Sequence, residues 1–131
     1  TGAAIPMDDY TASMDARQVP YELLDRAEIL ARWPQLALPE GTGDDAWLIA
    51  LDRIASAVEA HGASALVVSL GVDAALADPE SPLRVSHEGY ETGGRRLGAL
   101  RLPTVAVQEG GYHLDTIGDL VAVTLRGLAT A

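Results

Sequence analysis

Two apolar runs in the second half of the chain end in residues that could do chemistry. The run over residues 66–72 ends at Asp73, and the run over residues 103–109 leads into Gly110, Gly111 and Tyr112. The segment between the two runs has the pattern of a helix. A strand, a crossover helix and a parallel strand would bring Asp73 and Tyr112 to the same edge of one sheet. Ligands of open α/β sheets bind at that edge.

Each candidate has two interpretations. Asp73 has the right position for a zinc ligand, but a carboxylate there can also bond loop amides and hold the turn. Tyr112 follows two glycines, which permit backbone angles closed to other residues. Its hydroxyl could donate a hydrogen bond to a developing oxyanion, or its ring could pack over the edge of the sheet. Asp78, directly before Pro79, is typical of turn chemistry.

The three histidines give a weaker signal. His61 and His87 fall at the end and the start of predicted helices, whereas His113 adjoins Tyr112 and could line the mouth of a pocket. No two histidines have the i, i+4 spacing of a helical zinc pair. A catalytic zinc usually takes three protein ligands, and the chain offers one good candidate, Asp73. No nucleophile elbow, phosphate loop or dinucleotide fingerprint is present.

Composition excludes several classes of function. The chain has 131 residues, 48 % of them hydrophobic, which indicates a folded domain. The formal net charge of −10 is unfavourable for nucleic acid. It could attract a cationic substrate into a cleft, or it could serve only to keep the protein soluble. The absence of cysteine rules out disulfides and thiolate metal ligands. No apolar run approaches the ~20 residues of a membrane span, and no leader is apparent, so we expect a cytoplasmic protein without membrane contact.

The pattern divides the chain into a divergent segment, 1–37, and an α/β region, 38–131. In the first we expect a loop over 7–15 and a helix over 21–32, opened by Pro20 and ended by Pro34. A short edge strand is expected over 36–38. The second should contain a helix that is capped by Asp44 or Asp45 and ends at His61, where Gly62 can adopt the left-handed conformation that closes a helix. A strand over 65–70 and a loop over 71–85 should come next. A helix over 87–100 capped by Ser86, a strand over 104–108 and a helix capped by Asp115 or Thr116 and ending at 128 should follow.

These elements predict an α/β fold in which helices flank a parallel sheet. Both strands are apolar at nearly every position, so we expect them to be buried on both faces. The helix over 44–61 should bury a stripe consisting of Trp47, Leu51, Ile54, Ala55 and Val58. Gly93 and Gly94 each cost a helix about 1 kcal/mol, which a close approach of that helix to the sheet would explain.

Five motifs, taken together, resemble the C-terminal part of the zinc-dependent histone deacetylase superfamily, above all its acetylpolyamine amidohydrolase branch. They are residues 38–44 (LPEGTGD), 67–73 (VVSLGVD), 78–79 (DP), 88–90 (EGY) and 102–112 (LPTVAVQEGGY). The resemblance runs from about Leu38 to the end of the chain. It implies the C-terminal portion of the arginase/deacetylase fold.

The resemblance also implies roles for single residues. Asp73 corresponds to a zinc ligand and Tyr112 to the donor that stabilises the oxyanion, while Gly110, Gly111 and His113 are candidate substrate-binding residues beside it. The implied activity is zinc-dependent removal of acetyl groups from acetylated lysine or polyamine. The paired catalytic histidines and the Asp-x-His metal motif of the family have no counterpart in residues 1–37. The chain alone is therefore not expected to hold zinc in the family manner, and whether it is an enzyme by itself stays open.

Two hypotheses follow. In the first, the chain is one part of a deacetylase whose N-terminal half is a separate chain or has been cut away, and the site forms where the two meet. In the second, it is a binding module derived from the C-terminal half, in which residues 1–37 or self-association cover the exposed sheet edge. The residue types at positions 73 and 112 favour the first. The sequence does not distinguish acetylated lysine from acetylated polyamine, or define the oligomeric state.

Overall fold

The computed structural model describes residues 6–33 and 38–131. The chain divides into two compact units, residues 1–34 and 35–131, and each is described by itself. The first unit contains α1 (Met7–Ala16) and α2 (Arg26–Arg32). The second contains α3 (Asp44–His61), β1 (Leu66–Leu70), α4 (His87–Gly98), β2 (Thr104–Gln108) and α5 (Leu114–Ala129).

Helix α1 replaces the loop that we predicted over residues 7–15, so that prediction was wrong. Asp8 and Asp9 lie in its first turn, where the helix dipole favours negative charge. None of its residues is buried. The helix therefore forms from local preferences without an apolar face, which is why the search for hydrophobic periodicity missed it.

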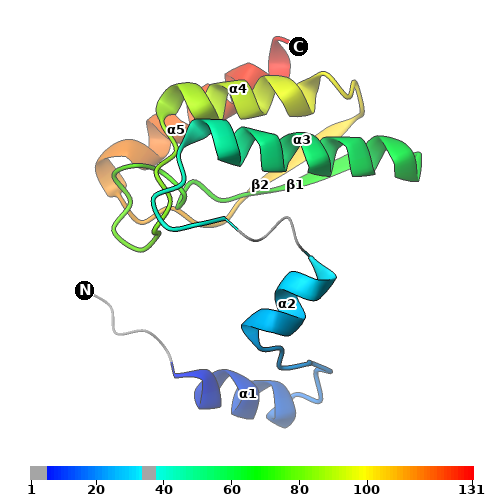
Figure 1. Cartoon of the computed structure of the whole chain (residues 1–131), viewed down its shortest axis with the longest axis vertical. Helices are drawn as coiled ribbons and strands as arrows, with labels where there is room; N and C mark the ends of the chain where they lie inside the picture. The colour runs from blue at the N-terminus through cyan, green and yellow to red at the C-terminus, as the bar shows by residue number, and fades with distance from the viewer. Residues whose placement is uncertain (1–5, 34–37) are drawn as a thin grey trace. The chain divides into compact units, whose positions relative to one another are not determined.

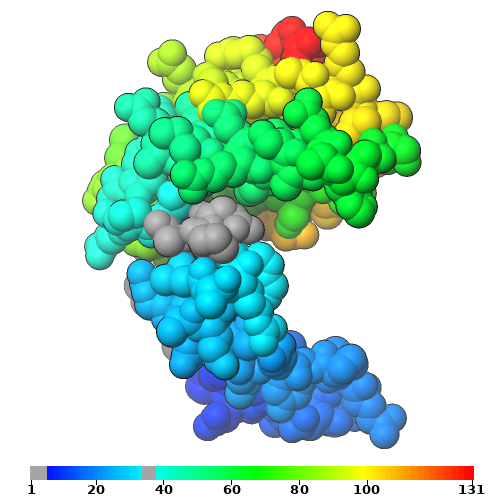
Figure 2. Space-filling view, turned by 45° about the vertical axis from the view of Figure 1, so that its right-hand side comes forward, coloured from blue at the N-terminus to red at the C-terminus, as the bar shows by residue number. Residues whose placement is uncertain are grey.

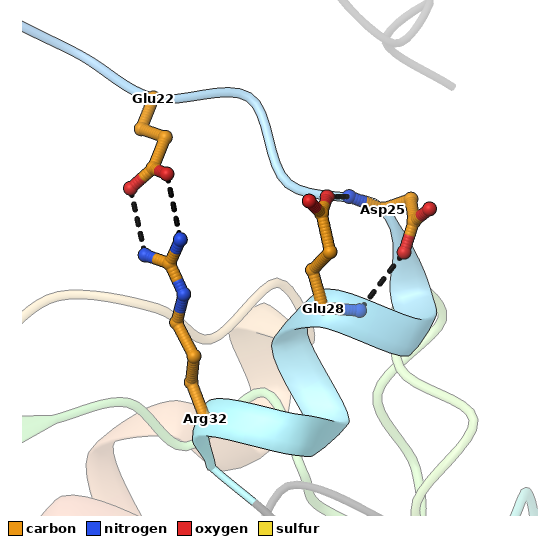
Figure 3. Close-up of polar contacts among 4 residues, drawn as sticks. All are labelled: Glu22, Asp25, Glu28 and Arg32. Carbon is orange, nitrogen blue, oxygen red and sulfur yellow. Dashed lines mark hydrogen bonds and ion pairs between the residues drawn. The ribbon is translucent and has the colours of Figure 1, made fainter.

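Helix α2 begins later than predicted, at Arg26 instead of residue 21. Asp25 and Glu28 form a reciprocal capping box, in which each carboxylate accepts the other residue's backbone N–H at 2.9 Å (Figure 3). Both carboxylate oxygens of Glu22 accept hydrogen bonds from the Arg32 guanidinium, at 2.6 and 2.7 Å (Figure 3). This guanidinium lowers the pKa of the Glu22 carboxyl. The cap at Asp25 sets the start of the helix, in place of the proline.

The second unit has the alternating order of helices and strands that the sequence predicts. Strands β1 and β2 pair in parallel, in a register from Leu66 opposite Thr104 to Leu70 opposite Gln108. They run side by side behind α3 in Figure 1. This arrangement confirms the α/β class with a parallel sheet. Of the edge strand predicted over 36–38, residues 36 and 37 lie outside the described residues, and Leu38 is not in a strand.

Two helix ends follow the predicted capping. The Ser86 hydroxyl accepts a hydrogen bond from the Gly89 N–H at 3.1 Å and caps α4. Gly62 ends α3 in the left-handed conformation, with φ +71°. Helix α4 ends at Gly98, two residues before the predicted boundary.

The starts of α3 and α5 differ from the prediction by one to three residues. Gly43 and His113 hold the cap positions, and neither supplies a side-chain cap. The Asp44 carboxylate is engaged elsewhere, because it accepts hydrogen bonds from the backbone N–H and hydroxyl of Ser86 at 2.7 and 2.6 Å. An acid that we assigned to its own helix thus ties the start of α3 to the start of α4.

The sheet is covered on one face only, so the prediction of strands buried on both faces was wrong. Val68 and Ala106 pack against the core, whereas Val67 and Val105, paired in the register, are 72 % and 61 % exposed. Val107, on the same face, is 46 % exposed. The two strands are apolar on both faces, but the described residues place a layer over only one of them.

The predicted stripe of α3 is only partly buried, because four of its five residues are half-buried and one is exposed. Leu48, which we did not include, is the one buried residue of this helix, and Ile54 is 44 % exposed. Trp47 does face inward, and its ring lies 5.4 Å from that of Tyr90. Helix α3 therefore contacts α4 at one end of its apolar face and leaves the remainder open.

The core gathers around α4 and the residues just beyond β1. Its buried members are Leu70, Val72, Ala75, Val85, Tyr90 and Leu120. Tyr90 is 1 % exposed, and its hydroxyl has no hydrogen-bond partner among the described residues. Burial, first, and then the Asp73 carboxylate raise the pKa of Tyr90 well above its usual range.

Helices α4 and α5 pack so closely that glycine is required at the contact. A methyl group on Gly94 would overlap the carbonyl oxygen of Thr124, and one on Gly127 would overlap that of Glu91. Gly93 faces Trp47 of α3. The glycines thus permit helix–helix contact, not the helix–sheet approach that we predicted. The side chains of α3 and α4 form adjacent ridges in the space-filling view (Figure 2).

The helix contact predicts opposite effects for two glycine substitutions. Gly94→Ala should lower the free energy of unfolding by about 1–3 kcal/mol, because the added methyl group overpacks a backbone contact. Gly118→Ala is the matched control, since nothing lies within 4 Å of its Cβ position in α5. It should raise stability by about 0.5–1 kcal/mol. Urea denaturation followed by circular dichroism measures both, and equal effects would contradict the packing described.

The Tyr90 hydroxyl predicts a second measurable effect. Tyr90→Phe removes a buried donor without a partner, so stability at neutral pH should stay within about 1 kcal/mol of the original or rise. Because folding raises the pKa of Tyr90, the protonated phenol favours the folded state, and that contribution is lost as pH rises above the unfolded value of about 10. Denaturation at pH 8 to 11 should therefore show a steeper loss for tyrosine than for phenylalanine. Parallel curves would refute this.

Candidate functional site

The loops after β1 and β2 leave the same edge of the sheet and continue to pair beyond it. The Glu109 N–H donates to the carbonyl oxygen of Leu70 at 3.0 Å. The Val72 N–H donates to the carbonyl oxygen of Gly110 at 2.8 Å. Parallel pairing therefore brings the segment that carries Asp73 against the segment that leads to Tyr112.

Asp73 lies in a seat made by two glycines. A methyl group on Gly110 would lie 2.8 Å from the carboxyl carbon of Asp73, and one on Gly71 would lie 2.7 Å from its Oδ1. Both distances are too short for a real side chain, so the carboxylate depends on glycine at both positions. In the described part of the chain no hydrogen bond ends on this carboxylate, so the alternative in which Asp73 holds the turn finds no support there.

The Asp73 carboxylate borders an open hollow of about 690 Å³. One wall is polar and comes from the sheet edge, where the Ser69 hydroxyl donates to the Glu109 carboxylate. The opposite wall is apolar and consists of α3 side chains, including Trp47 and Ile54. The uncovered stripe of α3 thus faces a cavity that also contains a candidate metal ligand.

The Tyr112 backbone contacts the loop after β1, whereas its ring does not line the hollow beside Asp73. Its side chain is 57 % exposed and does not line the hollow beside Asp73. Gly111 before it has φ +140°, a conformation that favours glycine as predicted, whereas Gly110 does not have a positive φ. The Tyr112 N–H donates to Oδ2 of Asp78 at 2.7 Å.

Asp78 does more than the sequence suggested. Its Oδ1 accepts the Glu80 N–H at 2.9 Å, which is the turn predicted from the Asp-Pro pair. The second bond, to Tyr112, spans 34 residues. No local pattern signals such a contact, and sequence reasoning missed it.

The histidines stay apart from the hollow. His113 is the N-cap residue of α5, and its Nδ1 lies 3.1 Å from the Thr116 hydroxyl. His61 and His87 are exposed at helix ends. Over residues 6–33 and 38–131, no group of three or more His, Asp or Glu side chains could hold a metal ion. The residues present therefore do not fit a zinc site by themselves.

None of the helices in the described ranges is both long and apolar enough to span a bilayer.

Comparison with known proteins identifies the family. Residues 31–128 match the histone deacetylase domain. The chain is 40 % identical over 82 residues to an acetylpolyamine amidohydrolase of Burkholderia pseudomallei, a match that covers 63 % of this chain and 24 % of that protein. It is 39 % identical over 90 residues to acetylpolyamine amidohydrolase 1 of Pseudomonas aeruginosa, covering 69 % and 26 %.

A solved structure agrees. The crystal structure of an acetylpolyamine aminohydrolase from Burkholderia pseudomallei superposes with a TM-score of 0.68 at 35 % identity, over 71 % of this chain and 27 % of that one. The chain thus spans about a quarter of the length of these relatives. Its two strands and their flanking helices correspond to a portion of the deacetylase fold, and the chain belongs to the histone deacetylase family.

Proposed function

We propose that this chain is the C-terminal portion of a deacetylase and contributes two groups to an active site completed by an N-terminal portion. Asp73 would supply one metal ligand and Tyr112 a hydrogen-bond donor. The observation that carries the proposal is the glycine seat, in which Gly71 and Gly110 leave the space that the Asp73 carboxylate occupies at the sheet edge. Family membership and the zinc dependence of the family support the same assignment.

The zinc would need ligands from outside this chain, because Asp73 alone does not form a site. A carboxylate that borders an open hollow, with no competing hydrogen bond in the described residues, is available for such a role. The exposed Tyr112 hydroxyl would donate to the oxyanion that develops on an acetyl carbonyl oxygen when its amide is attacked. Both groups would act on an acetyl amide bound between the two portions.

The partner we propose is the N-terminal portion of a deacetylase. The uncovered sheet face, with Val67, Val105 and Val107, exposes apolar surface that a further layer would bury. A two-stranded sheet has two unpaired edges, and such edges readily pair with another strand. The matched relatives are about four times as long as the segment they share with this chain.

The substrate class we propose is an acetylated polyamine or a similar small cationic amide. Acidic residues outnumber basic ones by 19 to 9, which attracts cations. The hollow beside Asp73 also carries the Glu109 carboxylate. The relatives that share 39–40 % identity are acetylpolyamine amidohydrolases.

Reassembly tests the proposal. The chain should be mixed with the residues of the Burkholderia pseudomallei relative that precede the matched segment, and zinc content and acetate release from acetylpolyamine should be measured. We expect about one zinc per complex and hydrolysis, whereas the chain alone should bind little zinc. Asp73→Ala should abolish both, because it removes a ligand. Asp119→Ala, an exposed acid on α5, is the matched control and should leave both unchanged.

Two outcomes would contradict this proposal. Stoichiometric zinc with turnover by the chain alone would mean that its own residues complete the site. A stable chain that neither associates with the N-terminal portion nor gains activity would favour the binding-module hypothesis instead.

The glycine seat predicts the effect of a single methyl group. Gly110→Ala should displace the Asp73 carboxylate, because its Cβ would lie 2.8 Å from Asp73 Oδ2. Zinc affinity of the reassembled protein should fall by about 10–100-fold, the usual effect of disturbing the support of a ligand. Gly118→Ala adds the same group on an open helix surface and should not change the affinity. Competition with a chelator measures both, and equal affinities would refute the role of the seat.

A further inference from the structure

Asp78 connects the loop after β1 to the loop after β2. The residue is only 8 % exposed, and the two oxygens of its carboxylate accept different backbone N–H groups. Oδ1 binds the Glu80 N–H at 2.9 Å, and Oδ2 binds the Tyr112 N–H at 2.7 Å. A hydrogen bond to an ionised, buried acceptor is stronger than one between neutral groups.

The Asp78 end of this contact is anchored to the core. Its own N–H donates to the carbonyl oxygen of Ala75 at 3.0 Å, and Ala75 is 3 % exposed. Ala75 in turn bridges to Val85, which is buried directly before α4. The carboxylate therefore projects from a segment that is fixed by packing on one side and by the Glu80 turn on the other.

Few other contacts among the described residues hold the Tyr112 end. The Gly110 carbonyl oxygen accepts the Val72 N–H, but Gly111, with φ +140°, lies between that bond and Tyr112. The Tyr112 ring is 57 % exposed, so packing does not immobilise it, and α5 begins only at Leu114 without a side-chain cap. Among the described residues, the hydrogen bond to Asp78 is the long-range hydrogen bond of the Tyr112 N–H, and it favours one position of the Tyr112 backbone.

We propose that Asp78 is a positioning residue that sets where Tyr112 presents its hydroxyl. The role of the hydroxyl as a donor to the oxyanion rests on the proposed function. The restraint of the Tyr112 backbone by Asp78 does not, because both residues belong to this chain. A carboxylate serves both amides at once. An asparagine retains one acceptor oxygen and could serve one of them, whereas alanine serves neither.

Amide hydrogen exchange in the full chain, measured by NMR, tests the restraint without any activity. Exchange at the Tyr112 N–H should become about ten- to hundredfold faster in Asp78→Ala, with Asp78→Asn intermediate. The Glu109 N–H, bonded to Leu70 before the glycines, is the internal control and should keep its rate. Asp115→Asn removes a charge close to Tyr112 without touching its amide bond and should change neither rate. An unchanged Tyr112 rate in Asp78→Ala would overturn the proposal, as would equal acceleration at Glu109.

The rate of catalysis in the reassembled protein tests whether Asp78 positions the Tyr112 hydroxyl for the reaction. Asp78→Asn should lower kcat for acetylpolyamine by about tenfold or more, with KM and zinc content unchanged, because the misplaced hydroxyl acts on the reacting oxygen and not on binding. A parallel loss of zinc would instead mean damage to the seat of Asp73 and would overturn the positioning role. If the original pair lacks activity, the proposed function fails, and the exchange rates alone then decide whether Asp78 restrains Tyr112.

Discussion

The arrangement of the second unit depends on the parallel pairing of β1 with β2. The register that sets Leu70 opposite Gln108 continues beyond the strands, where Val72 donates to Gly110. Parallel strands require a crossover, and α4 supplies it while packing on α5 through Gly94 and Gly127. The helices thus fix the strands, and the strands fix which loops meet. The seat of Asp73 is a consequence of that meeting.

The same pairing explains why the surface is unusually apolar. Strands of parallel sheets are normally covered on both faces, and the compositions of β1 and β2 suit that environment. In the second unit one face is covered by the core, while Val67 and Val105 remain exposed on the other. The matched relatives are about four times as long as the segment they share with this chain, and under the function we propose a further layer would cover the second face.

The sequence was sufficient for features that depend on neighbouring residues. The strand at 104–108 follows from a short apolar run, and the cap at Ser86 and the left-handed end at Gly62 follow from known end signals. The sequence was insufficient where a residue far along the chain competes for a hydrogen bond. The Asp44 carboxylate binds Ser86 and does not cap its own helix, and the Asp78 carboxylate binds a backbone N–H 34 positions away. The burial of β1 and β2 was mispredicted for a related reason. Apolar residues indicate that a strand face is suited to burial, but they do not show that another layer of the chain covers it.

Contacts inside the chain shape the surroundings of both candidate groups. Gly71 and Gly110 leave room for the Asp73 carboxylate, and Asp78 accepts a hydrogen bond from the Tyr112 backbone. Under the function we propose, a partner that added further ligands would meet a segment already folded and would lose less conformational entropy than one that had to order it. Because these contacts lie inside residues 70–113, this backbone geometry would not depend on the proposed N-terminal portion.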